Sequence, residues 1–307
     1  MIVPCFPDFI PLDIKLKDAL HPRLSLTFDG VSEFTFSGLY LFRNRYNYCI
    51  SRDISHEDGQ DGGFIISGEQ NTQEGRKTFF MTPCAVPDFK TLDSLFATHD
   101  YWKNISESVL SPAKEKLEKY GLIITEDRDN FDYLYNRSDL AQLAGKKFHK
   151  KKNHVNNFLS TYPNHKLQPM SANLVPQALE VLEQWRNEAL LKNDNEDGDY
   201  KSAKEALENF ELLALKGAIL FINDKPAAFC LGESIARGKM FVTHFEKAVN
   251  SYKGIYQYIN QAFAASLPGF FTLINREQDL GNEGMRQSKM TYRPCDFVRK
   301  YTARLVL

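Results

Sequence analysis

Long hydrophobic runs, an excess of one charge sign and paired cysteine motifs are all missing from this sequence. No apolar run approaches the roughly 20 residues that span a bilayer, so we expect no transmembrane segment. The 38 lysines and arginines nearly balance the 39 aspartates and glutamates, and the resulting net charge of -1 argues against a surface dominated by nucleic-acid binding. This balance still allows a local basic patch.

Cysteine usage excludes two further classes of protein. The five cysteines are odd in number and contain no Cys-x-x-Cys spacing, which favours reduced thiols in a cytoplasm over a disulfide framework or a zinc site. The first residues, MIVPCFPDFIPLD, lack the basic start of a signal peptide and carry three prolines and two aspartates. We therefore predict a soluble, cytoplasmic protein without a bound metal.

What the sequence does contain is an ordinary globular composition, with 43% hydrophobic and 25% charged residues. Its 307 residues suffice for two domains. Hydrophobic periodicity in the second half predicts two helices, a three-stranded antiparallel meander, and then helix, strand, helix and strand. The helices are expected at 174–192 and 200–215, the meander at 218–222, 227–234 and 240–246, and the later elements at 254–267, 270–274, 281–290 and 297–305.

The first half has a looser version of the same order. Helices are expected at 12–20, 31–42, 89–97 and 112–120, and strands at 46–50, 64–66, 78–81, 122–125 and 131–135. Two polar, turn-rich segments separate predicted elements, namely ISHEDGQDGG at 54–63 and NDNEDGDY at 193–200. We place the boundary after Pro163, which gives domains of residues 1–163 and 164–307.

This order of elements is that of the GCN5-related N-acetyltransferase (GNAT) fold. We therefore predict an α+β protein of two tandem GNAT-like domains, each a mixed, mostly antiparallel sheet flanked by helices. The second domain would carry the active site.

Two long strings carry a family resemblance, DYLYNRSDLAQLAGKKFHKKKNHVNNF at 132–158 and INREQDLGNEGMRQSKMTYRP at 274–294. They resemble the phosphatidylglycerol lysyltransferase C-terminal domain family, and more closely its stand-alone bacterial members. The resemblance implies tandem acetyltransferase-like domains related to the Fem peptidyltransferases. Characterised membrane members move an aminoacyl group from a charged tRNA to a lipid headgroup. The resemblance thus implies tRNA and a phospholipid headgroup at a membrane surface as partners.

The predicted strand at 240–246 offers a base for acyl transfer. Alternation along a strand would place His244 and Glu246 on one face and Thr243 and Phe245 on the other. A titratable pair on one face can take a proton from the attacking nucleophile. The alternative is a purely structural hydrogen-bonded pair.

The turn before the helix at 254–267 offers a place for the donor. Free amides at a helix start suit a phosphate group, so we predict that Lys253, Gly254 and Tyr256 contact the donor. Coenzyme A binders of this fold usually carry a glutamine or arginine followed by x-x-G-x-G or x-x-G-x-A here, whereas this turn has only Gly254 and matches neither pattern. This departure favours aminoacyl-tRNA over acetyl-CoA as the donor.

A basic segment, 146–156, holds five lysines and two histidines, and no acidic residue occurs between Gly145 and Pro163. In a helix, Lys151 and Lys152 would lie on or beside the apolar stripe, where an unpaired ammonium is unfavourable. We therefore predict that Lys151, Lys152 and Asn153 meet a phosphate-bearing ligand. The alternative is an internal ion-pair network with the upstream acids Glu126, Asp127, Asp129 and Asp132.

The charged segment at 274–294 is the remaining candidate. By resemblance, Arg276, Asp279, Arg286 and Lys289 match the family's motif, in which cations hold the donor or stabilise the oxyanion and an acid orients the acceptor amine. The alternative is a solvated helix start with paired charges. We predict His244, Glu246, Asp279, Arg286 and Lys289 as catalytic, and we add Arg276 and Glu277 to the residues that bind substrate.

We thus expect an acyltransferase that moves an aminoacyl group from aminoacyl-tRNA to a lipid headgroup or a small acceptor. Two alternatives stay open: an acetyl-CoA-dependent N-acetyltransferase acting on a small amine, and a catalytically degenerate GNAT-fold ligand-binding protein. An open pocket that reaches Gly254 and is lined by His244, Arg286 and Lys289 would favour an enzyme. Internal pairing of these side chains would favour the binding protein.

Overall fold

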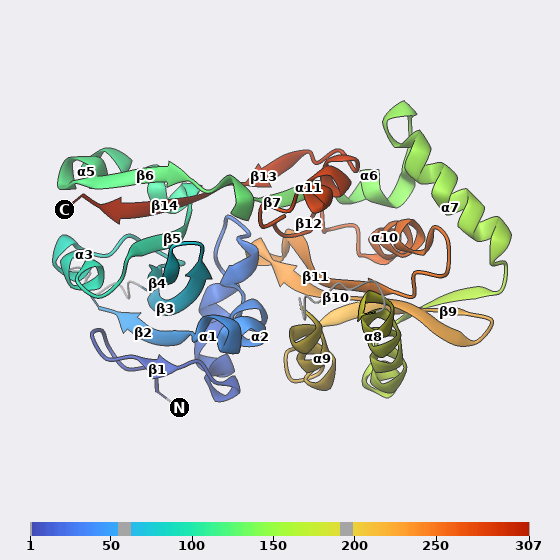
Figure 1. Cartoon of the computed structure of the whole chain (residues 1–307), viewed down its shortest axis with the longest axis horizontal. Coiled ribbons are helices and arrows are strands. Elements are labelled where there is room, and N and C mark those ends of the chain that lie inside the picture. Colours follow the sequence, from blue (N-terminus) through green and yellow to red (C-terminus); the bar gives the residue numbers. More distant parts are fainter. Residues whose placement is uncertain (1, 55–62, 191–198, 307) are drawn as a thin grey trace.

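The computed structural model describes residues 2–54, 63–190 and 199–306, which form two seven-stranded sheets side by side (Figure 1). The predicted polar segments at 54–63 and 193–200 lie largely outside these residues. In spatial order, the first sheet consists of β1 (Ile10–Pro11), β2 (Cys49–Asp53), β3 (Gly63–Thr72), β4 (Gly75–Met81), β5 (Tyr101–Ser106), β14 (Lys300–Leu305) and β6 (Leu122–Glu126).

The second sheet has the same number of strands and is also mixed. In spatial order it consists of β13 (Asp296–Val298), β7 (Asp132–Asn136), β12 (Leu273–Asn275), β11 (Met240–Ala248), β10 (Lys225–Ile235), β9 (Lys216–Ile222) and β8 (His165–Pro169). Within the described ranges each sheet contains one parallel pair, β4 with β5 and β11 with β12, and the other pairs are antiparallel.

Helices cover both faces of each sheet. Those of the first sheet are α1 (Lys17–Leu24), α2 (Phe36–Tyr46), α3 (Phe89–Phe96), α4 (Glu107–Leu110) and α5 (Lys114–Tyr120). Those of the second are α6 (Arg137–Gln142), α7 (His149–Thr161), α8 (Val175–Leu190), α9 (Tyr200–Glu208), α10 (Ile255–Ser266) and α11 (Glu283–Met290). The predicted fold, two tandem GNAT-like domains of the α+β class, is confirmed.

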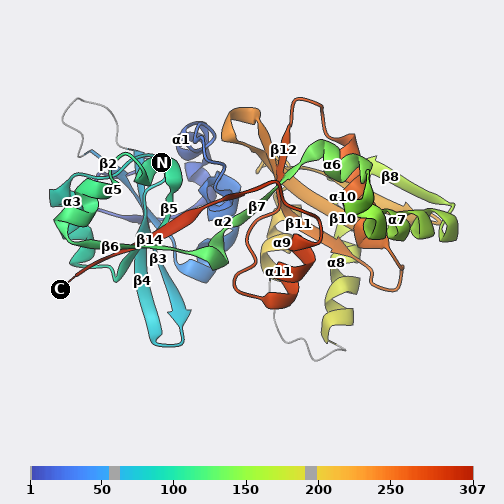
Figure 2. The same cartoon turned by 90° about the horizontal axis from the view of Figure 1, so that it is seen from above.

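The two sheets exchange strands, and the predicted boundary at residue 163 does not coincide with the division between them. β7 precedes residue 163 but pairs with β12 and β13 in the second sheet, and β14 follows it but pairs with β5 and β6 in the first. Figure 2 shows the C-terminal strand crossing back into the first sheet. The single strand expected at 297–305 is therefore two strands in different sheets, divided at Arg299.

One hydrophobic core reaches across the junction of the two sheets. It contains fully buried residues of α2, α8 and α9, including Phe36, Leu182 and Leu207, together with residues of both sheets. Two further cores lie on the opposite faces, one under α3 and α5 and one under α10. Burial of this apolar surface, at roughly 25 cal/mol per Å², favours the docked arrangement of the two units.

Some predicted helix boundaries were wrong. The helix expected at 112–120 begins at Lys114, because Ser111 caps the end of the short helix α4, where its amide donates to the Glu107 carbonyl oxygen. The helix expected at 12–20 runs on to Leu24 with Pro22 inside it. The second predicted helix extends to Tyr46 and ends at Asn47, which has a left-handed conformation (φ 49°). The strand expected from residue 46 therefore starts later.

Helix α7 carries the basic segment and lies at one end of the second sheet, beside α10 (Figure 1). Val155 and Phe158 are buried, whereas its lysines and histidines face outward to varying degrees. α7 packs closely on the turn that starts α10: a Cβ atom at Gly254 (φ +81°) would lie 2.7 Å from the His154 carbonyl oxygen. Glycine is required there both by this approach and by the left-handed backbone.

Candidate active site

A β-bulge in β11 decides which way its polar side chains point. Leu231 of β10 faces Phe245 and Gly232 faces Thr243, so His244 is an extra residue without a partner. The bulge breaks the alternation that predicted His244 and Glu246 on one face. His244 meets Glu233 and Glu277, whereas Glu246 meets Asn260 of α10 and Arg276, so that prediction was wrong.

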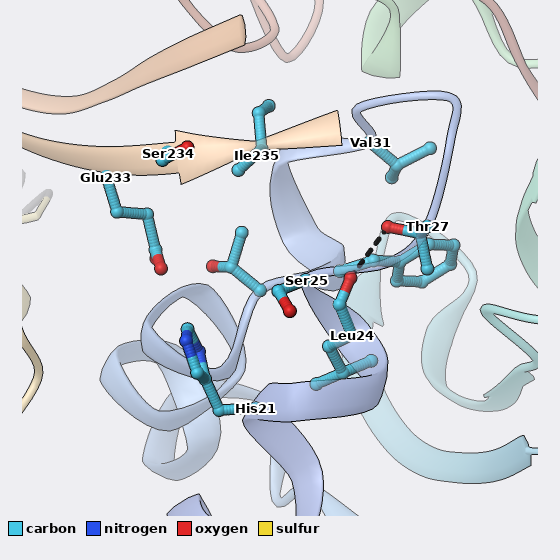
Figure 3. A pocket seen from close by; sticks show the side chains of 10 residues that line it. His21, Leu24, Ser25, Thr27, Val31, Glu233, Ser234 and Ile235 are labelled. Carbon is cyan, nitrogen blue, oxygen red and sulfur yellow. Dashed lines mark hydrogen bonds between the residues drawn. The ribbon is translucent and has the colours of Figure 1, made fainter. Parts of the chain in front are cut away.

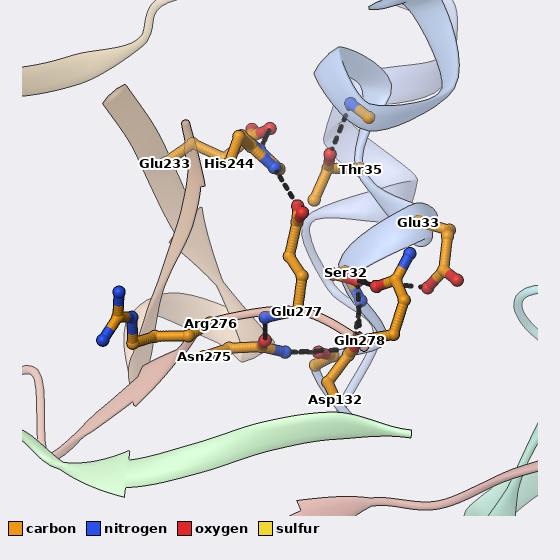
Figure 4. A network of polar contacts seen from close by, with 12 residues as sticks. Ser32, Glu33, Thr35, Asp132, Glu233, His244, Asn275, Arg276, Glu277 and Gln278 are labelled. Carbon is orange, nitrogen blue, oxygen red and sulfur yellow. Dashed lines mark hydrogen bonds and ion pairs between the residues drawn. The ribbon is translucent and has the colours of Figure 1, made fainter. Parts of the chain in front are cut away.

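His244 is enclosed by two carboxylates at the junction of the sheets (Figure 4). Its Nδ1 lies 2.7 Å from Glu277 Oε1 and its Nε2 lies 3.0 Å from Glu233 Oε1, and its side chain is 2% exposed. Burial alone would lower the pKa of His244, but the two carboxylates outweigh burial and raise it to about 10. Both ring nitrogens therefore donate at neutral pH, and this imidazolium does not fit the predicted role of a base.

A second buried network ties the sheets together around Asp132. Its carboxylate accepts hydrogen bonds from the Ser32 amide (2.8 Å), Asn275 Nδ2 (3.1 Å) and Lys300 Nζ (2.8 Å). Lys300 also pairs with Glu33. Figure 4 shows Ser32, Glu33, Asp132 and Asn275 meeting where the segment before α2 crosses the second sheet. The network fixes the start of the loop that follows β12.

Asp279, Arg286 and Lys289 hold that loop from the other side. Arg286 binds the fully buried Asp279 through two nitrogens (2.9 and 2.8 Å), and the Tyr133 hydroxyl adds a third hydrogen bond (2.5 Å). Burial would raise the pKa of Asp279, but these donors and the Gly281 amide lower it to about 2. Arg286 also binds Asp129 (2.7 Å).

The Lys289 ammonium also binds only the backbone of this loop in the described structure. Its Nζ donates to the carbonyl oxygens of Arg276 (2.6 Å), Glu277 (3.0 Å) and Gln278 (2.6 Å). Burial, together with the nearby positive charge of Arg276, lowers the pKa of Lys289 to about 8. Three of the predicted catalytic residues, Asp279, Arg286 and Lys289, thus shape the loop.

Glu246 and Arg276 do meet, just beyond the point where β11 and β12 stop pairing. The parallel register ends at Val242 and Asn275. Arg276 Nη2 lies 3.2 Å from Glu246 Oε1, and the two side chains are 18% and 13% exposed. Asn260 of α10 donates to Glu246 Oε2 (3.2 Å), and its own buried Oδ1 has no partner among the described residues. A carboxylate, a guanidinium and a free amide oxygen therefore lie side by side.

Helix α7 brings a second cation to this cluster. Lys151 Nζ lies 4.1 Å from the centroid of the Tyr292 ring, and the Arg276 guanidinium carbon lies 5.2 Å from the same ring. Burial, followed by repulsion from Arg276, lowers the pKa of Lys151, and no described carboxylate forms an ion pair with it. We call Lys151, Glu246, Asn260, Arg276 and Tyr292 the acid–base cluster.

The other predicted ligand-binding residues lie around this cluster without joining it. The Lys253 amide donates to the Tyr162 hydroxyl (3.3 Å), and the Tyr256 hydroxyl binds the backbone of Ala248. Lys152 and Asn153 are exposed on α7. Lys152 lines a surface hollow together with Leu143, Gly145, Lys146 and His149.

Two cavities can be described, and neither is lined by His244, Arg286 or Lys289. One is the hollow beside Lys152. The other is a small cavity of about 10 Å³ between α1 and β10, lined by His21 on one side and Glu233 on the other (Figure 3). Its size suits one water molecule. His244, Arg286 and Lys289 pair internally, which is the outcome expected for the binding protein, whereas Glu246 and Arg276 are the partly accessible pair.

Asn260 and Tyr292 were missed by the sequence analysis. Asn260 interrupts the buried stripe of α10 between Ile259 and Phe263, and a polar residue on an apolar stripe is a signal that could have identified it. Tyr292 follows α11 and carried no comparable signal. Among the described helices, none has the length and apolar character needed to cross a membrane.

The chain is similar to known proteins over nearly its whole length. The family model described as phosphatidylglycerol lysyltransferase, C-terminal, matches residues 26–304. A conserved protein of unknown function from Bacteroides thetaiotaomicron has a crystal structure with a TM-score of 0.81 at 29% identity, and the match covers 99% of this chain and 100% of that one.

Two other relatives are more distant. The C-terminal domain of a putative lysylphosphatidylglycerol synthetase from Agrobacterium fabrum matches with a TM-score of 0.58 and 13% identity over 95% of this chain and 92% of its own, a likeness that shows the fold. An uncharacterized protein of Mycoplasmoides gallisepticum is 25% identical over 190 residues. That match spans 60% of this chain and 58% of the relative's length.

Proposed function

Because the chain belongs to the phosphatidylglycerol lysyltransferase C-terminal family, we propose that it transfers an aminoacyl group from aminoacyl-tRNA to a lipid headgroup or a small acceptor. Family and fold together indicate a GNAT-like acyltransferase. The finer proposal rests chiefly on one observation: the acid–base cluster joins the end of the parallel strand pair to the basic helix α7.

The acid–base cluster supplies what acyl transfer requires. The acceptor's hydroxyl or amine attacks the ester carbonyl carbon of the aminoacyl group, and Glu246 takes its proton. Arg276 and Lys151 stabilise the oxyanion that develops on the carbonyl oxygen. The bond from that carbon to the ribose oxygen then breaks, and the proton held by Glu246 passes to the departing ribose oxygen. The free Asn260 Oδ1 would accept a hydrogen bond from the amino group of the donor or acceptor.

Helix α7 supports tRNA as the donor. Lys150 and Lys152 are exposed, and the segment between Gly145 and Pro163 contains no acidic residue to repel phosphates. The internal ion-pair alternative predicted for these lysines receives little support, because Asp129 pairs with Arg286 and Asp132 with Lys300. A phosphate backbone along α7 would place the aminoacylated end near Lys151.

The turn before α10 argues against acetyl-CoA as the donor. In this position α7 covers Gly254, and the Tyr162 hydroxyl already accepts from the Lys253 amide. A pyrophosphate would need these amides free. Incubation with labelled aminoacyl-tRNA and, separately, with labelled acetyl-CoA tests the choice. We expect label to leave the tRNA faster than by spontaneous hydrolysis. Consumption of acetyl-CoA with no reaction of aminoacyl-tRNA would refute the proposed donor.

A second candidate is a ligand-binding protein without catalysis. It is favoured by the internal pairing of His244, Arg286 and Lys289, which leaves these three groups unavailable to substrates. The same incubation separates the two functions. Saturable binding of charged tRNA with deacylation at only the spontaneous rate would support the binding protein and contradict the enzyme.

A further inference from the structure

We propose that the N-terminal copy contains a second binding site, which takes an oxyanion such as a phosphate group at Lys103. Lys103 is the third residue of β5 and is 8% exposed. Its Nζ donates to Gln70 Oε1 (2.6 Å), and it forms no ion pair with any carboxylate in the described part of the chain. A buried ammonium with one neutral partner is unfavourable, and an anion would relieve that cost.

Aromatic rings at the edge of the hydrophobic core surround the Lys103 ammonium. Its Nζ lies 4.8 Å from the centroid of the Phe79 ring and 5.4 Å from that of Tyr46. Tyr101 lies against Phe79, with ring centroids 5.7 Å apart. Tyr46 and Gln70 are partly exposed, so the Lys103 environment reaches solvent along their side chains. Aromatic faces stabilise the cation without neutralising it.

Polar atoms without partners occur on the residues next to Lys103 in β5 and at the end of β4. In the described structure the Tyr101 hydroxyl, Asn104 Oδ1 and Thr82 Oγ1 are buried and have no hydrogen-bond partner. Trp102 Nε1 also lacks a partner, but the Trp102 ring stacks on Phe80 in the core on the opposite face of the sheet. Buried polar atoms are paired in the great majority of cases, and a run of exceptions over adjacent residues indicates a missing ligand or water. The Tyr101 and Thr82 hydroxyls can donate, as does the lysine, so the chemistry fits an oxyanion.

In the first sheet, Lys103 occupies the position that corresponds to the candidate active site in the second sheet. β4 and β5 form the parallel pair of the first sheet, and their register ends at Phe80 and Trp102. Lys103 and Asn104 follow directly on β5, and Thr82 follows β4. In the second sheet the acid–base cluster likewise lies just beyond the end of the parallel pair. The two copies thus keep polar chemistry at the same point of the fold, with a carboxylate in one and a lone lysine in the other.

Binding of inorganic phosphate, measured by NMR titration of the full-length protein, tests the site directly. We expect saturable shifts in the wild type and an affinity at least about 10-fold weaker in Lys103→Met, the loss of one charged hydrogen bond. Lys103→Arg should retain binding. Lys116→Met removes an exposed lysine that also lies over an aromatic ring, Phe89, and serves as the matched control. Circular dichroism checks that each variant is folded, and Tyr101→Phe provides a second, milder change.

Two further titrations identify the source of the oxyanion. Glycerol 3-phosphate in place of phosphate represents a soluble ester, and phosphatidylglycerol vesicles, with phosphatidylcholine vesicles as the blank, represent a lipid headgroup. If glycerol 3-phosphate or the phosphatidylglycerol vesicles bind more tightly than free phosphate, and Lys103→Met loses this binding, the site is supported and the source of its oxyanion is identified. Equal binding to wild type and Lys103→Met, or no saturable binding to any probe, overturns the proposal. Glu246→Gln should bind phosphate as the wild type does. Phosphate binding at Lys103 can therefore be established even if the protein does not transfer an aminoacyl group.

Discussion

Single residues explain both the success and the failure of the predicted base. Glu246, Arg276 and Lys151 come from three segments far apart in the sequence, and the structure brings all three together. His244 is the extra residue of the bulge in β11, opposite Leu231 and Gly232, and the bulge turns it away from the other three residues toward the junction. A bulge leaves no mark in hydrophobic periodicity, so strand alternation could not reveal which of the two residues would reach the cluster.

The buried, protonated His244 stabilises the fold, and this contribution is lost at alkaline pH. Its folded pKa of about 10 lies above the ordinary value of 6.5, so the contribution is fully present below pH 6.5 and is lost as the pH rises toward 10. The lowered pKa of Lys289 acts in the opposite sense over part of this range, so the contribution of His244 is measured as the difference between wild type and His244→Gln. Between pH 6.5 and 10 we expect the free energy of unfolding, measured in urea, to fall by on the order of 3 kcal/mol more in the wild type than in His244→Gln. An unchanged slope in the variant would show that other groups cause it.

At the scale of the element, α11 serves the loop after β12. Lys289 occupies three carbonyl oxygens, so Lys289→Met should lower the free energy of unfolding by about 2–4 kcal/mol, because those buried acceptors lose their donor. Urea unfolding measures the loss. Lys204→Met, which removes a lysine from α9 whose side chain is 44% exposed, should change stability by less than about 0.5 kcal/mol. A stable Lys289→Met protein with transfer abolished would instead assign this lysine to catalysis.

Helix α7 allows a charge test of tRNA binding. Lys150→Glu with Lys152→Glu changes two exposed residues, so the fold should persist while tRNA affinity falls and the salt dependence of binding weakens by roughly one unit of log–log slope per lost phosphate contact. Filter binding over a series of salt concentrations gives both quantities. Lys114→Glu with Lys119→Glu on the distant helix α5 is the control. Equal losses in both double variants would show a general charge effect.

At the scale of the whole molecule, the exchange of β7 and β14 makes each half incomplete on its own. Fragments 1–163 and 164–307 would leave β5 and β6 without β14, and β12 and β13 without β7. We expect neither fragment alone to show dispersed NMR amide signals or cooperative unfolding, and mixing the two should restore both properties. Independent folding of either fragment would contradict a structural role for the exchange.

The sequence predicted the elements and their order better than it predicted which strands pair. Periodicity identified most helices and strands and, through their order, the tandem GNAT-like fold, because amphipathic spacing is a local property. Pairing partners are not local: nothing in residues 300–305 distinguishes a strand of the first sheet from one of the second. Polar networks such as that of Lys300 and Asp132 arise only from this docking, which is why they were not predicted.

The rate of transfer by Glu246→Gln tests whether the Glu246–Arg276 pair is catalytic. Single-turnover reaction with labelled aminoacyl-tRNA should slow by about 100-fold or more, because the amide cannot take the acceptor's proton, while tRNA affinity stays near that of the wild type. Glu211→Gln, an exposed substitution outside the acid–base cluster, should react at the wild-type rate. Transfer by Glu246→Gln at the wild-type rate would contradict the central claim that the Glu246–Arg276 pair is the catalytic site.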